Sequence, residues 1–153
     1  MQGEAAAVRF ERRLIDSLYT EAMVLADEAR DYFDESGRAD RDGLAPLTRV
    51  AFSCESLKIT TRLMHVIAWL LTQRAVMAGE LSLGDALDGS RRLGDAPASE
   101  GGVIETLPQR AQTLVASSSR LHARVAQLDR AQAGAMPPAS PARMMFERLS
   151  GAF

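Results

Sequence analysis

The sequence has little of what would mark a secreted protein or a membrane protein. Its 153 residues include a single cysteine, Cys54, which excludes an intramolecular disulfide and fits a reducing cytoplasm. In the most apolar segment, residues 55–76, the longest stretch without a formal charge runs from Leu63 to Gln73, well short of the roughly 20 residues of a membrane span. The N-terminal residues lack a basic segment followed by an apolar run, so we expect no signal peptide.

An excess of charge of either sign is also missing. The chain has 18 Lys and Arg against 20 Asp and Glu, a formal net charge of -2. General binding to nucleic acid or to an anionic membrane needs a strong positive field, so we expect no membrane partner and regard a nucleic-acid partner as poorly supported. Four arginines in the last periodic segment predict only a mildly basic, solvated helix face: Arg110, Arg120, Arg124 and Arg130.

Motifs and residue clusters typical of catalysis are absent. The sequence contains no phosphate-binding loop, no dinucleotide-binding glycine pattern, no nucleophile elbow and no Cys-x-x-Cys pair. The two histidines, His65 and His122, lie in different segments and belong to no metal-ligand pattern. His122 directly follows Leu121, so we expect it to face solvent. Cys54 falls in an apolar seam, where we expect a buried and unreactive thiol. We therefore expect no enzyme activity, no metal and no cofactor.

What is present is helical periodicity, which predicts an all-α protein. Apolar residues recur with a period of 3.6 over about 8–36, 47–78 and 106–131, and Pro46 and Gly79 mark the start and the end of the second segment. In the last segment these residues form one seam: Leu107, Ala111, Leu114, Ser118, Leu121, Val125 and Leu128. Residues 80–105 are rich in Gly, Ser and Ala and predict a mobile loop, in which Ser82 begins one short helical turn. Residues 132–153 predict a flexible, Pro-rich tail. The fold expected is an elongated three-helix bundle, with residues 1–131 as its single domain and a long central helix.

The central segment carries two apolar seams side by side. The first seam, at a/d spacing, we assign to the bundle core: Leu47, Val50, Cys54, Leu57, Thr61, Met64, Ala68, Leu71 and Ala75. The second we assign to a homodimer interface: Phe52, Ile59, Leu63, Val66, Leu70 and Met77. The alternative is that a bundle helix touches two neighbours and needs both seams inside one chain.

The remaining sector of the central segment is polar and surrounds the only Trp. Its members resemble a binding hot spot and are predicted to contact a partner: Lys58, Arg62, His65, Trp69 and Gln73. The alternative is that the indole packs against another helix or the 80–105 loop, with its N–H bonded to a polar neighbour. The tail ends in a second predicted partner-binding group, which consists of Met144, Met145, Phe146 and Leu149.

Three blocks of this sequence resemble the RcdA family, the regulators of CtrA degradation. The long block is ESLKITTRLMHVIAWLLTQRAVMAGE (55–80), and DSLYTEAMVLADEARDYFDESGR (16–38) and RLHARVAQLD (120–129) are similar to the family's first and last helices. The resemblance implies a homodimeric three-helix bundle with a flexible tail. It also implies a bacterial, cytoplasmic adaptor that joins ClpX or ClpXP, its priming factors and protein cargo, and it leaves recruitment to the cell pole open.

A different reading of the same pattern has no link to a protease. A helical bundle with arginines on its last helix could serve transcriptional regulation or act as a structural dimerisation module. Retention on DNA that falls steeply with salt concentration would favour this alternative.

Overall fold

The computed structural model describes residues 2–135 and 141–151, and within them every regular element is a helix. Three long helices form the body of the molecule: α1 (Gln2–Asp31), α3 (Pro46–Met77) and α6 (Gln109–Ala135). The short helices are α2 (Arg38–Asp42), α4 (Leu83–Ala86), α5 (Gly101–Ile104) and α7 (Pro141–Ser150). The predicted all-α fold is confirmed.

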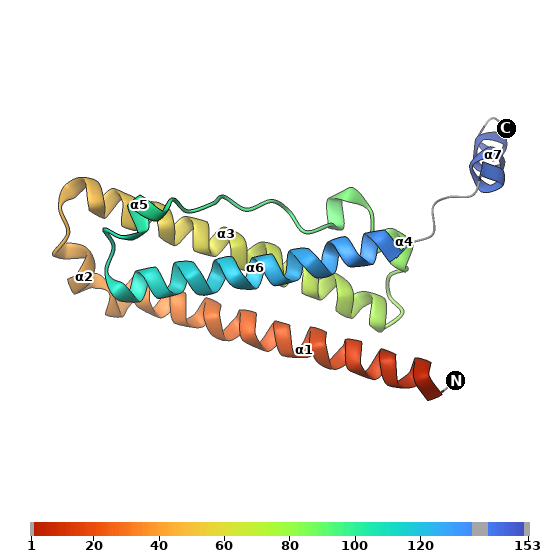
Figure 1. The fold of residues 1–153 in the computed structure, drawn as a ribbon, viewed down its shortest axis with the longest axis horizontal. Coiled ribbons are helices and arrows are strands. Elements are labelled where there is room, and N and C mark those ends of the chain that lie inside the picture. Colours follow the sequence, from red (N-terminus) through yellow and green to blue (C-terminus); the bar gives the residue numbers. More distant parts are fainter. Residues whose placement is uncertain (1, 136–140, 152–153) are drawn as a thin grey trace.

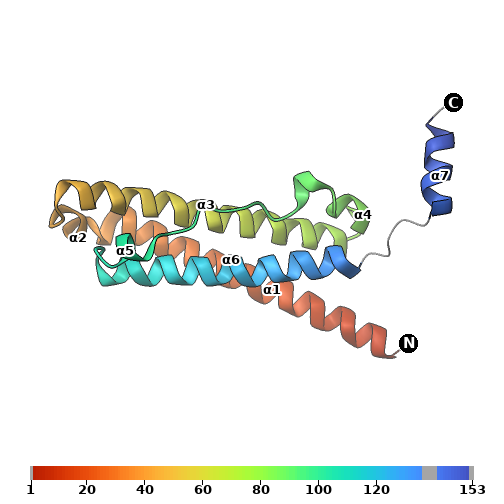
Figure 2. The same ribbon diagram turned by 45° about the horizontal axis from the view of Figure 1, so that its top comes forward.

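The long helices lie side by side and make an elongated bundle (Figure 1). The central helix α3 has 32 residues, which at 1.5 Å per residue gives a length of about 48 Å. A π-helical turn, Tyr32–Ser36, continues α1 toward α2. At the opposite end of the molecule, the N-terminal part of α1 diverges from α3 and α6 (Figures 1 and 2). The bundle is therefore closed at one end and open at the other.

The boundaries of α3 follow local chemistry that can be read from the sequence. Pro46 occupies the first turn, where its missing N–H removes no intrahelical hydrogen bond. The helix ends just before Gly79, whose φ of 76° lies in the left-handed region that glycine enters without steric cost. The short turn predicted after Ser82 is helix α4, and the Ser82 side chain accepts a hydrogen bond from the Asp85 N–H.

The last bundle helix begins later than predicted and ends later as well. α6 begins at Gln109, directly after Pro108, and the Thr106 hydroxyl donates to the carbonyl of Val103. The predicted inward seam of this helix is correct. Its members are buried in the core, apart from Leu128, which is partly buried against it: Leu107, Ala111, Leu114, Ser118, Leu121, Val125 and Leu128.

The predicted flexible tail, residues 132–153, contains helical residues. Residues up to Ala135 continue α6, and Pro141–Ser150 form α7. A proline in the first turn of a helix costs no hydrogen bond, so Pro141 begins α7 rather than preventing it. The rest of the predicted tail, residues 136–140 and 152–153, lies outside the described residues.

Candidate protein-interaction site

An extended segment, residues 92–100, lies over the polar face of α3 and alongside α6 (Figure 2). We call this segment the strap. It comes from the 80–105 region that the sequence predicts to be a mobile loop. Hydrogen bonds join it to four of the residues predicted to contact a partner or to face solvent, which are Lys58, Arg62, His65 and His122. The polar face of α3 is thus occupied by the protein's own chain.

Buried charges form the first group of contacts under the strap. Arg62 of α3 is 3% exposed and Glu55, two turns earlier, is 1% exposed. The Arg62 guanidinium donates to the Ser118 hydroxyl of α6 at 3.2 Å and to the Pro97 carbonyl of the strap at 3.0 Å. It also donates to the hydroxyl of Ser99, which in turn donates to the Glu55 carboxylate. One strap serine therefore links the two charges.

Lys58 completes the neutralisation of Glu55. Its ammonium lies 3.1 Å from the Glu55 carboxylate and also donates to the Ala98 carbonyl at 3.1 Å. Burial lowers the pKa of the Arg62 guanidinium and the nearby Glu55 carboxylate opposes that effect. Arginine keeps its proton at neutral pH, so the cluster holds two cations and one anion with all of these donors and acceptors engaged.

The two histidines of the chain converge on one backbone carbonyl of the strap. His65 Nδ1 and His122 Nε2 both donate to the Gly94 carbonyl, at 3.3 and 3.1 Å. The strap is so close here that a Cβ at position 94 would lie 3.1 Å from atoms of the His65 ring. Gly94 therefore lets the backbone approach both imidazoles. His122, which we expected to face solvent, is half-buried by this contact.

Trp69 forms the third group of contacts, between α3 and α6. The indole is 4% exposed and its N–H donates to the Asp129 carboxylate at 3.0 Å. Arg92 of the strap pairs with both oxygens of the same carboxylate at 2.8 Å. Nearby, the Gln73 and Gln132 side chains exchange two hydrogen bonds across the helices. The alternative in which the indole N–H bonds a polar neighbour is the one observed.

Asp129 carries a pKa shift that makes this contact sensitive to acid. Burial opposes ionisation, but the hydrogen bonds from Arg92 and Trp69 outweigh it, so the pKa of Asp129 lies below its ordinary value of 3.8. A lowered folded-state pKa means that the carboxylate stabilises the fold above about pH 4. This stabilisation is lost as the pH falls below that value and through the folded-state pKa.

We therefore expect Asp129→Asn to cost stability at pH 6 and to cost less at pH 3. The expected loss at pH 6 is about 1–3 kcal/mol in the free energy of unfolding, because the substitution weakens charge-assisted hydrogen bonds to a buried group. Urea unfolding of both variants at the two pH values measures it. Asp34→Asn, at an exposed carboxylate, is the control and should change stability by less than about 0.5 kcal/mol at either pH. A loss that does not shrink at pH 3 would contradict the assignment.

The prediction that this face of α3 is free to bind a partner is consequently wrong. Arg62, Trp69 and Gln73 are buried, while Lys58 and His65 are half-buried and bound to the strap. A binding hot spot and a well-satisfied core cluster have the same composition, because both need aromatic rings and hydrogen-bonding side chains. Two members of the buried cluster, Glu55 and Asp129, were missed by the sequence analysis.

The two apolar seams of α3 have the reverse of their predicted burial. The seam assigned to a dimer interface is core within one chain: Phe52, Ile59, Leu63, Val66 and Leu70 are buried, and Met77 is partly buried against them. The seam assigned to the core is largely exposed. We call its exposed members the α3 stripe, namely Leu47, Val50, Cys54, Leu57, Met64, Ala68 and Leu71. Cys54, expected to be buried, is exposed within it.

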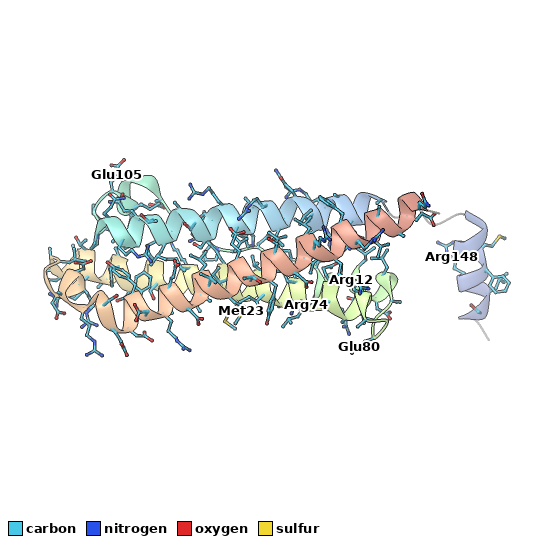
Figure 3. All side chains as sticks on the ribbon, turned by 90° about the horizontal axis from the view of Figure 1, so that it is seen from below. Arg12, Met23, Arg74, Glu80, Glu105 and Arg148 are labelled. Carbon is cyan, nitrogen blue, oxygen red and sulfur yellow. The ribbon has the colours of Figure 1, made fainter. Side chains whose placement is uncertain are left out.

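The α3 stripe is an apolar surface that the bundle leaves open. Leu47 is 85% exposed and Leu57 is 69% exposed. Beside the stripe, a groove of about 400 Å³ runs between α1 and α3, and Met23 and Met64 are among its lining residues. Figure 3 shows Met23 and Arg74 on the side where α1 lies against α3, and Arg74 pairs there with Asp16 at 3.0 Å. An apolar ridge next to a groove can receive another helix.

The tail supplies a second exposed apolar group. On α7, the side chains of Met145, Phe146 and Leu149 are exposed. The side chain of Met144 lies outside the described residues. Within residues 2–135 and 141–151, no group of three or more His, Cys, Asp and Glu side chains is arranged to hold a metal ion. No helix in that same part of the chain has both the length and the apolarity needed to cross a bilayer.

Comparison with known proteins identifies relatives of the chain. Residues 6–153 match the model of a family described as "Protein of unknown function (DUF1465)". Among solved structures, RcdA from Caulobacter crescentus CB15 is similar, with 34% sequence identity and a TM-score of 0.66. The match covers 82% of this chain and 96% of the RcdA chain. No curated protein sequence matches.

Proposed function

Because this chain belongs to the DUF1465 family and to the family of RcdA, we propose that it is a homodimeric adaptor without catalytic activity. In this role it helps to deliver cell-cycle regulatory proteins to the ClpXP protease. The observation that carries the proposal is the similarity to RcdA, at 34% identity over 82% of the chain. The three sequence blocks that resemble the regulators of CtrA degradation lie within bundle helices α1, α3 and α6 or directly follow them.

An adaptor needs surfaces for other proteins rather than reactive groups. Binding cargo and protease together turns a weak bimolecular capture into a nearly intramolecular one, with an effective concentration in the millimolar range for short tethers. The exposed apolar side chains of the α3 stripe and of α7 are the surfaces we assign to this work. We assign the stripe to contact with a second copy of the chain, and the apolar side of α7 to contact with the protease complex or its cargo.

The alternative role in transcription receives less support from the arrangement of arginines on α6. Arg110 pairs with Glu28 at 3.4 Å, and Arg124 pairs with Glu21. Both pairs join α6 to α1, so these guanidinium groups serve contacts within the bundle. Because a nucleic acid would have to replace these carboxylates with its phosphates, we favour the adaptor role.

Reconstitution with purified components tests the proposal. We expect the immobilised chain to retain ClpX together with its priming factors, and to speed ClpXP degradation of dilute cargo at least tenfold. A chain ending at Ala135, which lacks α7 but keeps all three bundle helices, should fold and lose retention of at least one partner. Absence of ClpX retention with and without priming factors would refute the adaptor role. A salt-sensitive retention on DNA would favour the alternative.

A further inference from the structure

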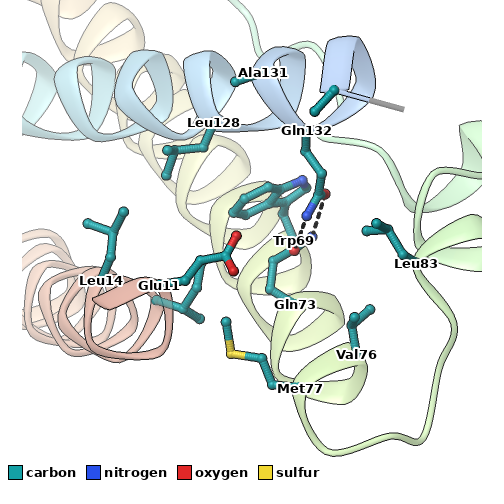
Figure 4. A pocket seen from close by; sticks show the side chains of 12 residues that line it. Glu11, Leu14, Trp69, Gln73, Val76, Met77, Leu83, Leu128, Ala131 and Gln132 are labelled. Carbon is teal, nitrogen blue, oxygen red and sulfur yellow. Dashed lines mark hydrogen bonds between the residues drawn. The ribbon is translucent and has the colours of Figure 1, made fainter. Parts of the chain in front are cut away.

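The open end of the bundle contains an apolar cleft, which we call the end cleft. It has a volume of about 560 Å³ and lies between α1, α3 and α6, with α4 at one side (Figure 4). Its lining includes Leu14, Met77, Leu83, Leu128 and Ala135. The cleft exists because α1 diverges from the other two helices at this end (Figures 1 and 2). It therefore presents apolar side chains from all three bundle helices to solvent.

A single acidic group marks one wall of this cleft. Glu11 of α1 lines it, and Figure 4 shows its carboxylate directed toward the indole of Trp69 across the opening. On the opposite wall, Gln73 and Gln132 are already paired with each other. Among the described residues that line the cleft, Glu11 is the only charged one. An occupant that matches this site would be apolar on one side and carry a cation at the edge of that side.

Helix α7 has these properties. Met145, Phe146 and Leu149 fall within about 100° of one another around a helix, which places them on one face. All three are exposed, and Phe146 is 75% exposed. Arg148 falls about 60° from Met145, at the edge of this apolar face. In Figure 3, Arg148 and the rest of α7 stand apart from the bundle.

Chain connectivity puts the cleft within reach of α7. α6 ends at Ala135, which itself lines the cleft, and α7 begins at Pro141. Six Cα–Cα steps of at most 3.6 Å allow the start of α7 to lie anywhere within about 20 Å of that wall. The helix has 10 residues and is about 15 Å long. A short tether also gives it a local concentration that no free partner reaches.

We propose that α7 folds back into the end cleft of its own chain, with Met145, Phe146 and Leu149 against the cleft walls and Arg148 beside Glu11. The end cleft is then a receptor for an amphipathic, cationic helix, and α7 is its resident occupant. This inference stands independently of the adaptor role. It has a consequence for that role, because the apolar side of α7 would reach a partner only after leaving the cleft.

Amide hydrogen exchange of the full chain tests the proposal. An isolated helix of this length is marginal in water, so undocked α7 would exchange freely. The comparison variant is Leu83→Asp, which puts a charge into the cleft from α4 and leaves the three bundle helices unchanged. We expect the amides of residues 145–150 to exchange at least tenfold more slowly in the unmodified chain than in this variant. Protection that is independent of protein concentration identifies an intramolecular contact.

Charge reversal provides a second measurement. Glu11→Lys should reduce the protection of residues 145–150 at least threefold, and the double variant Glu11→Lys/Arg148→Glu should restore it. Glu4→Lys is the matched control, because Glu4 is also an exposed acid on α1 but does not line the cleft, and it should have no effect. The proposal is overturned if α7 is unprotected in the unmodified chain, or if neither cleft variant alters its protection. Protection that rises with protein concentration would assign the cleft to a second copy and also overturn it.

Discussion

Arg62→Met is expected to lower the free energy of unfolding by about 3 kcal/mol. The guanidinium is buried among Ser118, Ser99 and the Pro97 carbonyl, so its loss leaves several polar groups without their donor. Glu55 would remain buried with only Lys58 as a nearby cation. The cost lies at the low end of the range for breaking a buried charge pair, because Lys58 still pairs with Glu55 at 3.1 Å.

A double-mutant cycle separates the charge contribution from simple packing. If Glu55 and Arg62 stabilise each other, the double variant Glu55→Met/Arg62→Met should lose at least 1 kcal/mol less free energy of unfolding than the two single variants lose together. Couplings of this size are usual between residues of one hydrogen-bond network. Arg74→Met is the matched control. Arg74 makes an exposed ion pair with Asp16 and stacks over the Tyr19 ring at 3.9 Å, contacts worth up to about 1 kcal/mol.

Urea unfolding measures these free energies, and limited proteolysis within residues 92–100 reports on the strap. In Arg62→Met the strap should be cleaved faster, because two of its anchoring bonds are gone. A loss below 1 kcal/mol together with unchanged cleavage of residues 92–100 would contradict the assigned role of Arg62. It would mean that the strap is held by its other contacts.

The helices were predictable because their signals are local. Pro46 at the start of α3, Gly79 just after its end and Ser82 before α4 each act on neighbouring backbone groups, and each lies where the sequence predicts. The inward seam of α6 was also predictable, because that helix has one apolar face and charges opposite it. Local chemistry therefore defines where a helix begins and ends, and a single narrow apolar stripe defines which face of the helix is buried.

The orientation of α3 was not predictable from its own pattern. Its apolar residues cover an arc of roughly 200°, so two adjacent seams compete for the core and periodicity cannot rank them. The strap decides between them, because it covers Arg62 and Trp69 and so requires the polar sector to face inward beside the buried seam. Gly, Ser and Ala in the strap have little apolar surface, and they anchor through backbone carbonyls and one hydroxyl, which hydropathy does not register.

A sharper signal for the inward polar sector was present in the sequence. Glu55, Lys58 and Arg62 recur at spacings of three and four along one face, which is the pattern of a charge cluster that neutralises itself. Asp129 is an acidic residue that directly follows Leu128 of the inward seam of α6, and in the structure it accepts a hydrogen bond from Trp69. Pairing an isolated indole with an isolated acid on another helix needs the helix register, which only the folded arrangement supplies.

Leu57→Asp is expected to convert the proposed dimer into a monomer. If the α3 stripe meets a second copy, each dimer contains the substitution twice, because a two-fold interface uses the same surface on both chains. Burying an unpaired carboxylate at an apolar contact costs about 2 kcal/mol or more. Two such costs weaken association by about 1,000-fold. Sedimentation equilibrium over a range of concentrations measures the change.

The control variant must add the same charge on another exposed helix face. Ala123→Asp on α6 does so, since Ala123 is exposed and lies outside the α3 stripe. We expect this variant to remain dimeric and to unfold at the same urea concentration as the unmodified chain. Leu57→Asp should also keep its bundle, because Leu57 is 69% exposed within one chain.

Cys54 gives an independent readout at the same surface, because it is the only cysteine and lies one turn before Leu57. In the dimer its thiol would be covered, so a thiol reagent should modify the unmodified chain at least tenfold more slowly than it modifies Leu57→Asp. The thiol of Ala123→Asp should be as slow as that of the unmodified chain. A chain that is monomeric at 100 times the concentration used in the proteolysis assay would refute the dimer itself. A dimer that survives Leu57→Asp with a freely reactive Cys54 would instead move the interface away from the α3 stripe, since the stripe would then be open to solvent in both copies.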